Sequence, residues 1–322
     1  MPDPQAPVEI ALLLYPGCQM ATVHGLGDLF SVANSHARDH GGAQRIRCSH
    51  WSRGPDGWAR GFDSHPGPGQ PQIVVVPGRL GPPLSAEESA PYADWLRDRH
   101  AAGAVLASVC VGAFLLGHSG LLSGRRATTH WYFTEAFHQA FPDVLLAPEA
   151  ILVEEGDMLT AAGMMAWTDL GLRLVHRVLG PTVMADTAKF LLVDPAGREQ
   201  RHYSAFNPRL SHGDAAVLRV QHWLQSRAGR DVSVAQMAAE AGLEPRTFLR
   251  RFQRATGQRP TEYVQHLRVA AARERLEFSR DPVERIAWDV GYEDAAAFRR
   301  VFQRVTGLSA SAYRDRFGTL RH

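Results

Sequence analysis

The chain is 322 residues long with a formal net charge of +2, and its 45% hydrophobic and 21% charged residues are typical of a soluble globular protein of two domains. The first seven residues lack the regions of a signal peptide, and the uncharged run 101–117 is too short and too interrupted to span a membrane. Three cysteines without framework spacing exclude a disulfide scaffold, so we expect a cytoplasmic protein.

The first 195 residues alternate between buried strands and helices. Continuous apolar runs predict strands, and each run is followed by a helical pattern. The runs are 8–14, 73–76 and 104–109, and the helical segments are 20–33, 86–102 and 111–119. Buried strands that alternate with helices form a parallel sheet covered by helices on both faces. The sequence therefore predicts a flavodoxin-like α/β domain, whose ligands bind at the carboxyl ends of the strands.

Cys110 lies where the third predicted strand turns into a helix. Small residues in the run Ser108-Val-Cys-Val-Gly112 permit a tight turn, as in a nucleophile elbow. The helix N-terminus would favour a thiolate or a bound anion here. We predict a ligand pocket formed by Cys110, Val111, His130 and Gly78. His130 is equally consistent with a structural histidine.

Other candidate sites are weaker. His36 and His40 have a spacing that suits a metal ion, but no third ligand is near them, so we expect no metal. Cys18 and Cys48 are best explained as small buried hydrophobic residues. No glycine-rich phosphate-binding loop is evident, and we expect no cofactor.

A polar stretch from 192 to 213, punctuated by proline and glycine, indicates a domain boundary. Residues 215–322 carry 19 arginines and 12 acidic residues, a net charge of +7, whereas residues 1–214 carry a net charge of −5. A basic module on an acidic body is typical of a DNA-binding domain joined to a domain with another role. We predict domains at 1–197 and 215–322, with a linker at 198–214.

The C-terminal part contains one pattern twice. The run Phe248-Leu-Arg-Arg-Phe-Gln-Arg-Ala-Thr-Gly257 recurs fifty residues later as Phe298-Arg-Arg-Val-Phe-Gln-Arg-Val-Thr-Gly307. Each copy combines a short apolar helix, a glycine turn and an arginine-rich helix, which is the layout of a helix-turn-helix. The arginine-rich helices are predicted at 245–255 and 294–305. A helix over 260–279, roughly 28 Å long, would let both copies enter successive major grooves.

Phenylalanines and arginines occupy opposite faces of these two helices. The phenylalanines are four residues apart and are predicted to be buried. The arginines that we expect to contact DNA are Arg246, Arg250 and Arg254 in the first copy and Arg299, Arg300 and Arg304 in the second. Arginine can pair with guanine O6 and N7, which is worth about 1–3 kcal/mol of discrimination. Ala295 and Ala296 offer only apolar contact, so the first copy should carry more of the polar base recognition.

This repeat resembles the DNA-binding domain of the AraC family of bacterial transcription activators. The resemblance covers about 215–322 and is most specific in the run from Gly291 to Tyr313. It implies DNA contacts by Arg246, Arg250, Arg299 and Arg300. One departure is Ala310, where the first copy has Pro260, and it should soften the last turn without removing the fold.

The N-terminal part is similar to the ThiJ/PfpI group of class I glutamine amidotransferase-like domains. The segments that carry this similarity are 14–17, 110–117, 120–131, 160–163 and 169–170. Together the two resemblances point to the GlxA-like regulators, which fuse such a domain to an AraC-type tail. Active members of the ThiJ/PfpI group pair the cysteine with a glutamate just after the first strand, and in many a histidine follows the cysteine. Here the segment 17–22 has no carboxylate and Val111 follows Cys110, so no activating partner is evident.

Three hypotheses remain for the function. We favour a sequence-specific DNA-binding transcription regulator, controlled by a small metabolite in a non-catalytic pocket near Cys110. The second is a Cys-dependent hydrolase or amidotransferase-like enzyme with a DNA-binding tail. The third is a DNA-binding protein whose body only drives oligomerisation. Under the first hypothesis the protein is not an enzyme, and its partners are duplex DNA at a promoter or operator, a small-molecule effector, a second copy of the chain and RNA polymerase. The resemblance is to a family of activators, but the sequence leaves activation and repression both open, and we expect no membrane association.

Overall fold

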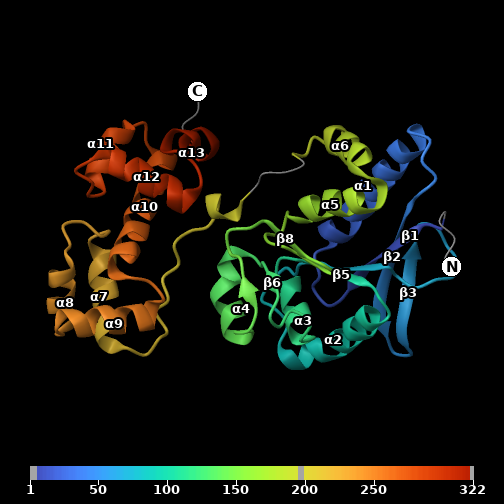
Figure 1. Cartoon of the computed structure of the whole chain (residues 1–322), viewed down its shortest axis with the longest axis horizontal. Coiled ribbons are helices and arrows are strands. Elements are labelled where there is room, and N and C mark those ends of the chain that lie inside the picture. Colours follow the sequence, from blue (N-terminus) through green and yellow to red (C-terminus); the bar gives the residue numbers. More distant parts are fainter. Residues whose placement is uncertain (1–5, 195–198, 320–322) are drawn as a thin grey trace. The chain divides into compact units, whose positions relative to one another are not determined.

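The computed structural model describes residues 6–194 and 199–319, and the chain divides into two compact units, Met1–Gln200 and Arg201–His322 (Figure 1). The first unit is an α/β domain, and the second is helical. The predicted boundary at 197/198 lies outside the described residues, so the predicted domain limits remain a proposal. Among the described residues, no helix combines the length and the hydrophobicity that crossing a bilayer requires.

The first unit is built around a seven-stranded sheet with the order β3-β2-β1-β4-β5-β9-β8. The strands are β1 (Val8–Leu14), β2 (Ile46–Gly54), β3 (Gly57–Asp63), β4 (Ile73–Val76), β5 (Val105–Val109), β8 (Leu152–Glu155) and β9 (Met158–Ala161). The central strands run parallel, with Ile10 of β1 opposite Cys48 of β2 on one side and Ile73 of β4 on the other. The predicted α/β fold is therefore confirmed, and its central sheet is parallel.

Both edges of the sheet differ from the expected all-parallel arrangement. Strand β3 is antiparallel to β2, and β8 is antiparallel to β9. Only Pro55-Asp56 and Gly156-Asp157 connect the two pairs, and such short connections return the chain in the opposite direction. Strand β3 has no buried residue, so a search for continuous apolar runs does not detect it.

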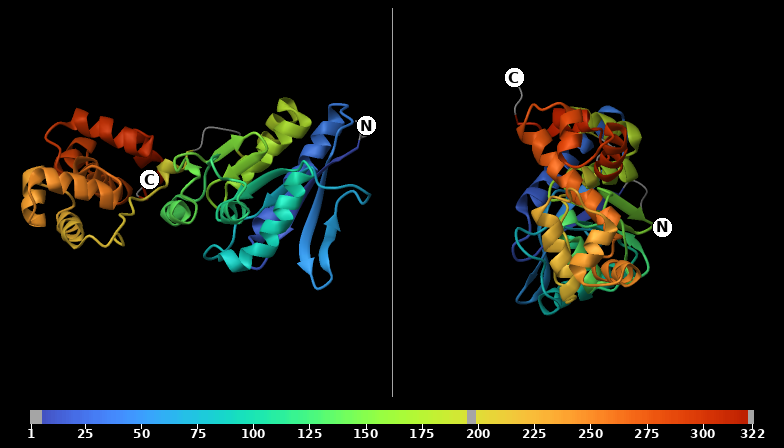
Figure 2. Two further views of the ribbon diagram at one scale, coloured as in Figure 1. Left: turned by 60° about the horizontal axis from the view of Figure 1, so that its bottom comes forward. Right: turned by 90° about the vertical axis from the view of Figure 1, so that its left-hand side faces the viewer.

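In the part of the first unit that the structure describes, six α-helices lie on the two faces of this sheet (Figures 1 and 2). They are α1 (Met20–Asp39), α2 (Ala86–Ala101), α3 (Gly112–His118), α4 (Thr134–Ala140), α5 (Trp167–Leu179) and α6 (Pro181–Phe190). Helix α1 packs against α5 and α6, whereas α2 packs against α3. Two short strands, β6 (Arg126–Ala127) and β7 (Leu145–Leu146), pair outside the main sheet, and a 3-10 turn η1 (Trp131–Phe133) follows β6.

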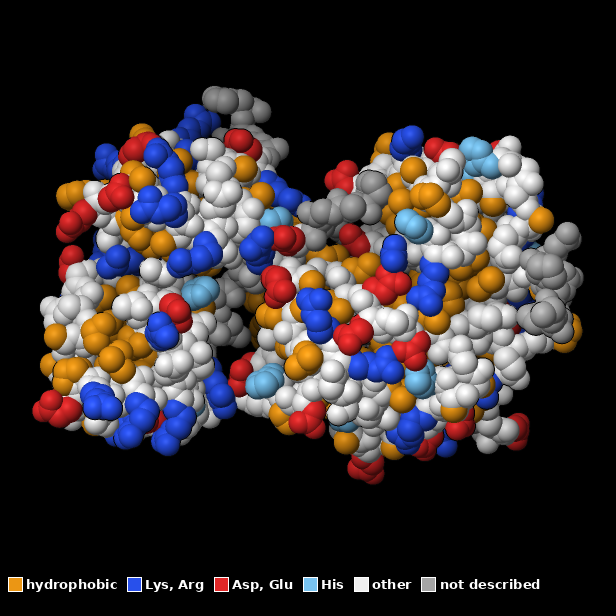
Figure 3. Space-filling view, in the orientation of Figure 1, with side chains coloured by type: hydrophobic (Ala, Val, Ile, Leu, Met, Phe, Trp, Pro, Cys, Tyr) orange, Lys and Arg blue, Asp and Glu red, His pale blue; other side chains and the backbone are white. Residues whose placement is uncertain are grey.

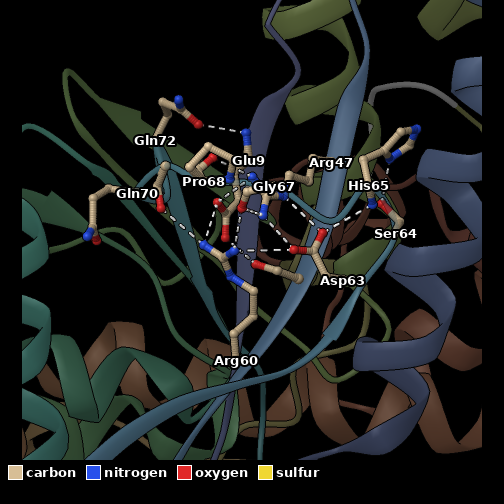
Figure 4. A network of polar contacts seen from close by, with 12 residues as sticks. Glu9, Arg47, Arg60, Asp63, Ser64, His65, Gly67, Pro68, Gln70 and Gln72 are labelled. Atoms are coloured by element: carbon tan, nitrogen blue, oxygen red, sulfur yellow. Dashed lines mark hydrogen bonds and ion pairs between the residues drawn. The ribbon is translucent and has the colours of Figure 1, made fainter.

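A buried ion network ties the first three strands together at the amino end of β1 (Figure 4). Glu9 is 2% exposed, and its Oε2 lies 3.1 Å from Nη2 of Arg60. Arg47 holds Asp63 through Nη2 and Oδ2 at 2.5 Å, and this hydrogen bond lowers the pKa of Asp63. Both arginines also donate to carbonyl oxygens of the loop 67–69. The network lies at the opposite end of the sheet from Cys110, so it supports the scaffold rather than the predicted pocket.

The described residues of the second unit form seven α-helices around two hydrophobic cores. The helices are α7 (Ala215–Ser226), α8 (Val234–Ala241), α9 (Pro245–Thr256), α10 (Pro260–Phe278), α11 (Val283–Asp289), α12 (Ala295–Thr306) and α13 (Ala310–Phe317). Helix α10 contributes Val264 to the first core and Val269 to the second, so it joins the two copies of the repeat. Gly242 ends α8 with a φ of 66°, as the predicted turn requires. The duplicated helix-turn-helix is confirmed.

A candidate nucleic-acid interface and a candidate ligand site

Helix α9 presents arginines on the face opposite its buried phenylalanines. Phe248 and Phe252 are fully buried, whereas Arg246, Arg250 and Arg254 are exposed. Figure 3 shows basic side chains gathered along the lower edge of the second unit, over α9. This arrangement follows from the 3.6-residue period of a helix, which places positions four apart on one face. The three arginines can therefore reach a groove or the phosphates beside it.

Helix α12 repeats the arrangement with one difference. Phe298 and Phe302 are fully buried, and Arg299, Arg300 and Arg304 are exposed. Arg299 forms an ion pair with Glu284 of α11, and Nη2 of Arg304 donates to Gln265 Oε1 at 2.6 Å. Two arginines of the second copy thus already have protein partners, which DNA would have to replace.

Arg251, beside Arg250, has a structural role. Its Nε and Nη2 donate to the two carboxylate oxygens of Asp214 at 2.9 and 2.7 Å. This hydrogen bond holds the pKa of Asp214 below its usual range. The corresponding residue of the second copy is Val301, which is buried. The equivalence of Arg251 with a buried residue therefore indicates that Arg251 faces the protein, whereas its neighbour Arg250 faces solvent.

Cys110 follows β5 directly and adopts the strained backbone of an elbow. Its φ is 55°, a value that a residue with a Cβ atom rarely adopts, and its N–H donates to the carbonyl oxygen of Ala161 at 2.8 Å. The side chain is 1% exposed, and burial raises the pKa of the thiol to about 11. The thiol is therefore protonated at neutral pH, although it precedes a helix N-terminus.

Gln19 lies next to Gly78, which also adjoins Cys110, and the sequence alone does not reveal this neighbourhood. Its N–H donates to the carbonyl oxygen of Gly78 at 2.8 Å, and its Oε1 accepts a hydrogen bond from Thr22 Oγ1 at 2.7 Å. A Cβ atom on Gly78 would lie 3.2 Å from Cys110 Cβ and 3.5 Å from Gln19 Oε1. The absence of a side chain at Gly78 thus allows the other two to approach. Gln19 follows the first strand, but its side chain is an amide, so it is not among the carboxylates that a catalytic pattern requires.

The four residues predicted to form the pocket are placed differently. Gly78 and Val111 are both buried next to Cys110. The backbone of Gly78 faces the Cys110 side chain, and Val111 follows Cys110 in the chain. His130 is half-buried, and burial lowers its pKa. Its ring lies 5.4 Å from that of Trp131, and its Nδ1 accepts a hydrogen bond from the N–H of Tyr132 at 3.1 Å. His130 therefore holds the η1 turn, and the hydroxyl of its neighbour Thr129 donates to the carbonyl oxygen of Cys110.

Thr129 connects Cys110 to the end of the first unit. Its hydroxyl donates to the carbonyl oxygen of Cys110 at 2.9 Å, and its own carbonyl oxygen accepts from Gln200 Nε2 at 3.0 Å. Gln200 is 2% exposed, and its Oε1 accepts a hydrogen bond from the N–H of Trp131 at 2.9 Å. The last residue of the first unit is thus held by the residue that touches the elbow.

The two spaced histidines have other contacts. Nε2 of His40 lies 2.8 Å from Asp186 Oδ2, and the ring of His36 lies against that of Phe190. Within the described part of the chain, no three His, Cys, Asp or Glu residues are grouped so that they could hold a metal ion.

Two protein-family models match separate parts of the chain. The DJ-1/PfpI family matches residues 66–177, and a helix-turn-helix domain matches residues 237–316. Each match falls within one of the two units. Each match also includes one of the candidate sites, Cys110 in the first and the arginines of α9 and α12 in the second.

Several proteins resemble the chain over one or both of these parts. The HTH-type transcriptional regulator CdhR of Pseudomonas aeruginosa is 26% identical over 235 residues, which cover 73% of this chain and 69% of CdhR. The HTH-type transcriptional regulator GlxA of Rhizobium meliloti is 27% identical over 243 residues, which cover 74% of each chain. Isonitrile hydratase of Pseudomonas putida is 35% identical over 121 residues, but they cover only 37% of this chain and 49% of the enzyme.

Proposed function

We propose that the chain is a GlxA-like transcription regulator, in which a DJ-1/PfpI domain precedes an AraC-type helix-turn-helix domain, and that a small metabolite bound near Cys110 controls its DNA binding. In this proposal the first unit recognises the metabolite without turnover. The arginines of α9 and α12 read a promoter or operator.

The neighbourhood of Cys110 carries the non-catalytic part of the proposal. Gln19 is an amide and cannot take a proton from the thiol as a carboxylate can. Burial raises the pKa of Cys110 to about 11, so little thiolate is present to attack a substrate. Val111, which follows the cysteine, offers no base. These three features favour a binding site over an active site.

The contacts of Thr129 support a route from this site to the DNA-binding unit. A ligand that moves the Cys110 carbonyl would disturb the hydroxyl of Thr129, which donates to it. Thr129 in turn holds Gln200, and Arg201 begins the second unit. A ligand acts in this way only if it binds one arrangement of these residues better than another.

The proposal includes partners that the resemblance implies. We infer that the protein acts in the cytoplasm as a homodimeric activator that contacts RNA polymerase. Two copies of the chain would place four helix-turn-helix motifs on paired operator sites. A strictly monomeric particle, measured by light scattering with and without DNA, would contradict the dimer.

Ligand binding to the full chain tests the proposal directly. We expect at least one metabolite to raise the Tm of the wild type and to change its affinity for promoter DNA. Gly78→Ala adds a methyl group that would lie close to both Cys110 and Gln19. It should therefore weaken binding of that metabolite and leave the DNA affinity of the ligand-free protein unchanged. If no metabolite raises Tm, the first unit is better explained as an oligomerisation domain.

The second candidate function is an enzyme, and the local similarity to isonitrile hydratase is the observation that favours it. Turnover of isonitrile or amide substrates that disappears in Cys110→Ala would establish this alternative. A rate that is equal in the wild type and in Cys110→Ala would exclude a role for the thiol.

A further inference from the structure

The DNA-binding unit contains a pocket of about 190 Å³ that the proposed DNA contacts do not use. It is lined by the segment 204–207, by Gln258, by His266, Val269, Ala270 and Arg273 of α10, and by Val305 of α12. The wall thus includes residues from both copies of the repeat and from the segment that leads into the unit. One water takes about 30 Å³ in the liquid, so the pocket has room for a molecule of roughly six non-hydrogen atoms.

Arg273 brings a buried positive charge to this pocket. The residue is 9% exposed, its Nη2 donates to the carbonyl oxygen of Arg201 at 2.9 Å, and its Nη1 donates to that of Ser204. Its Nε–H has no hydrogen-bond partner within the described chain. Arg273 forms no direct ion pair with a described residue; the Tyr313 ring lies 5.4 Å from its guanidinium carbon, and the carboxylate of Glu277 attracts it from beyond ion-pair distance. A buried guanidinium is normally paired directly with an anion.

Gln258 supplies a second polar atom without a partner. Its Oε1 is buried and accepts no hydrogen bond from any described residue. The corresponding residue of the second copy is Leu308, which packs against the second core. The fold therefore accepts an apolar side chain at this place, and the oxygen at Gln258 is available for a donor.

The rest of the wall is mostly aromatic and apolar, with the neutral polar residues Ser204 and Asn207 and the imidazole of His266. The ring of His266 stacks on that of Phe206 with centroids 5.2 Å apart. Burial lowers the pKa of His266, and the positive charges of Arg304 and Arg273 lower it further. Val269, Ala270 and Val305 offer hydrocarbon surface. The pocket is therefore suited to a small anion with an apolar body.

We propose that this pocket binds a small organic carboxylate with a hydrogen-bond donor next to the carboxyl group, that is, an α-hydroxy or α-amino acid. The carboxylate accepts from Nε–H of Arg273, and the adjacent hydroxyl or ammonium donates to Oε1 of Gln258. Bound waters could meet the two hydrogen bonds, but an anion on Nε–H also supplies the direct charge partner that Arg273 lacks among the described residues.

The pocket is lined in part by the segment with which the second unit begins. Arg273 holds the carbonyl oxygens of Arg201 and Ser204, and the residues that follow form part of the wall. A carboxylate on Arg273 would therefore strengthen the attachment of this segment to α10. This proposal does not depend on a ligand near Cys110.

Isothermal titration of the full chain with lactate, propionate and lactamide tests the proposal. We expect saturable binding of lactate. Propionate should bind about tenfold more weakly because it lacks the donor, a difference equivalent to one hydrogen bond of about 1.4 kcal/mol. Lactamide has the shape of lactate without the charge, and it should not bind.

Two variants assign the binding to this pocket. Gln258→Leu copies Leu308 of the second copy, so it should fold, bind lactate no better than propionate, and still reject lactamide. Ala270→Leu fills the pocket from its apolar wall and should abolish binding of both acids. Retained affinity for duplex DNA and an unchanged circular dichroism spectrum would show that the variants are folded.

Three results would overturn the proposal. Lactamide could bind as well as lactate, the wild type could show no saturable binding of either acid, or Ala270→Leu could bind lactate like the wild type. None of these results bears on metabolites that raise Tm through the region of Cys110, because Gly78→Ala and Ala270→Leu change different units.

Discussion

Gln200 donates a hydrogen bond from its side-chain amide to the carbonyl oxygen of Thr129 at 3.0 Å. The hydroxyl of Thr129 donates in turn to the carbonyl oxygen of Cys110 at 2.9 Å. Three residues from distant parts of the chain therefore form one line of hydrogen bonds from the elbow to the end of the first unit. Gln200 is 2% exposed, so this line is shielded from competing water.

Gln200→Leu should break this line. The N–H of Trp131 would lose its partner, and an unsatisfied buried donor costs about 1–3 kcal/mol. Urea denaturation of the full chain should therefore show lower stability, and an effector should no longer change DNA affinity. Gln225→Leu makes the same change at an exposed site on α7 and should have neither effect. Normal effector response in Gln200→Leu would rule out this route.

Arg250→Ala should relax base preference in the first helix-turn-helix. An exposed arginine that pairs with guanine contributes about 1–3 kcal/mol of discrimination, which binding to operator variants would measure. Arg251→Ala is the matched control, because Arg251 is bound to Asp214. That variant should lose stability but keep the base preference. Unchanged preference in Arg250→Ala and in Arg300→Ala would refute the assignment of both arginines.

Arg254→Ala should weaken DNA binding evenly across sequences. Arg254 lies one turn beyond Arg250 on α9, where a phosphate contact is expected. Removal of one such contact should reduce the slope of log K against log salt concentration by about 0.9. Arg53→Ala, at an exposed site of the first unit, should leave the slope unchanged. An equal slope in Arg254→Ala and the wild type would remove Arg254 from the interface.

Cys110 should react with iodoacetamide only at high pH. Burial raises the pKa of its thiol to about 11, so the folded protein keeps a proton that the unfolded chain loses near pH 8.5. The folded state binds more protons between these values, and stability should fall as pH rises through this window. The difference in unfolding free energy between the wild type and Cys110→Ala should show this fall. Rapid alkylation of Cys110 at pH 7 in the folded protein would contradict it.

Glu9→Gln should destabilise the first unit strongly. Loss of one charge from a buried network leaves its partners uncompensated and typically costs about 3–5 kcal/mol. Asp94→Asn removes one partner of an exposed ion pair with Arg97 and should cost about 1 kcal/mol or less. Guanidinium unfolding of the two variants compares the costs. Similar losses in both would show that the network around Glu9 is hydrated.

The sequence by itself determined the class of both units. Apolar runs and helical periodicity are local properties, so they predicted the central strands and the helices that follow them. The repeat with its glycine turns predicted two helix-turn-helix motifs, and the period of a helix separated Phe248 from Arg250. These features depend on residues within a few turns of one another.

Only the tertiary structure decided which distant residues meet. The sheet order brings Gln19 and Gly78 to Cys110, and the loops after β6 bring Thr129 to the same place. Arg250 and Arg251 are neighbours in the chain, yet it is Arg251 that donates hydrogen bonds to Asp214. No local pattern encodes these contacts, because each depends on how strands and helices far apart in sequence pack against one another.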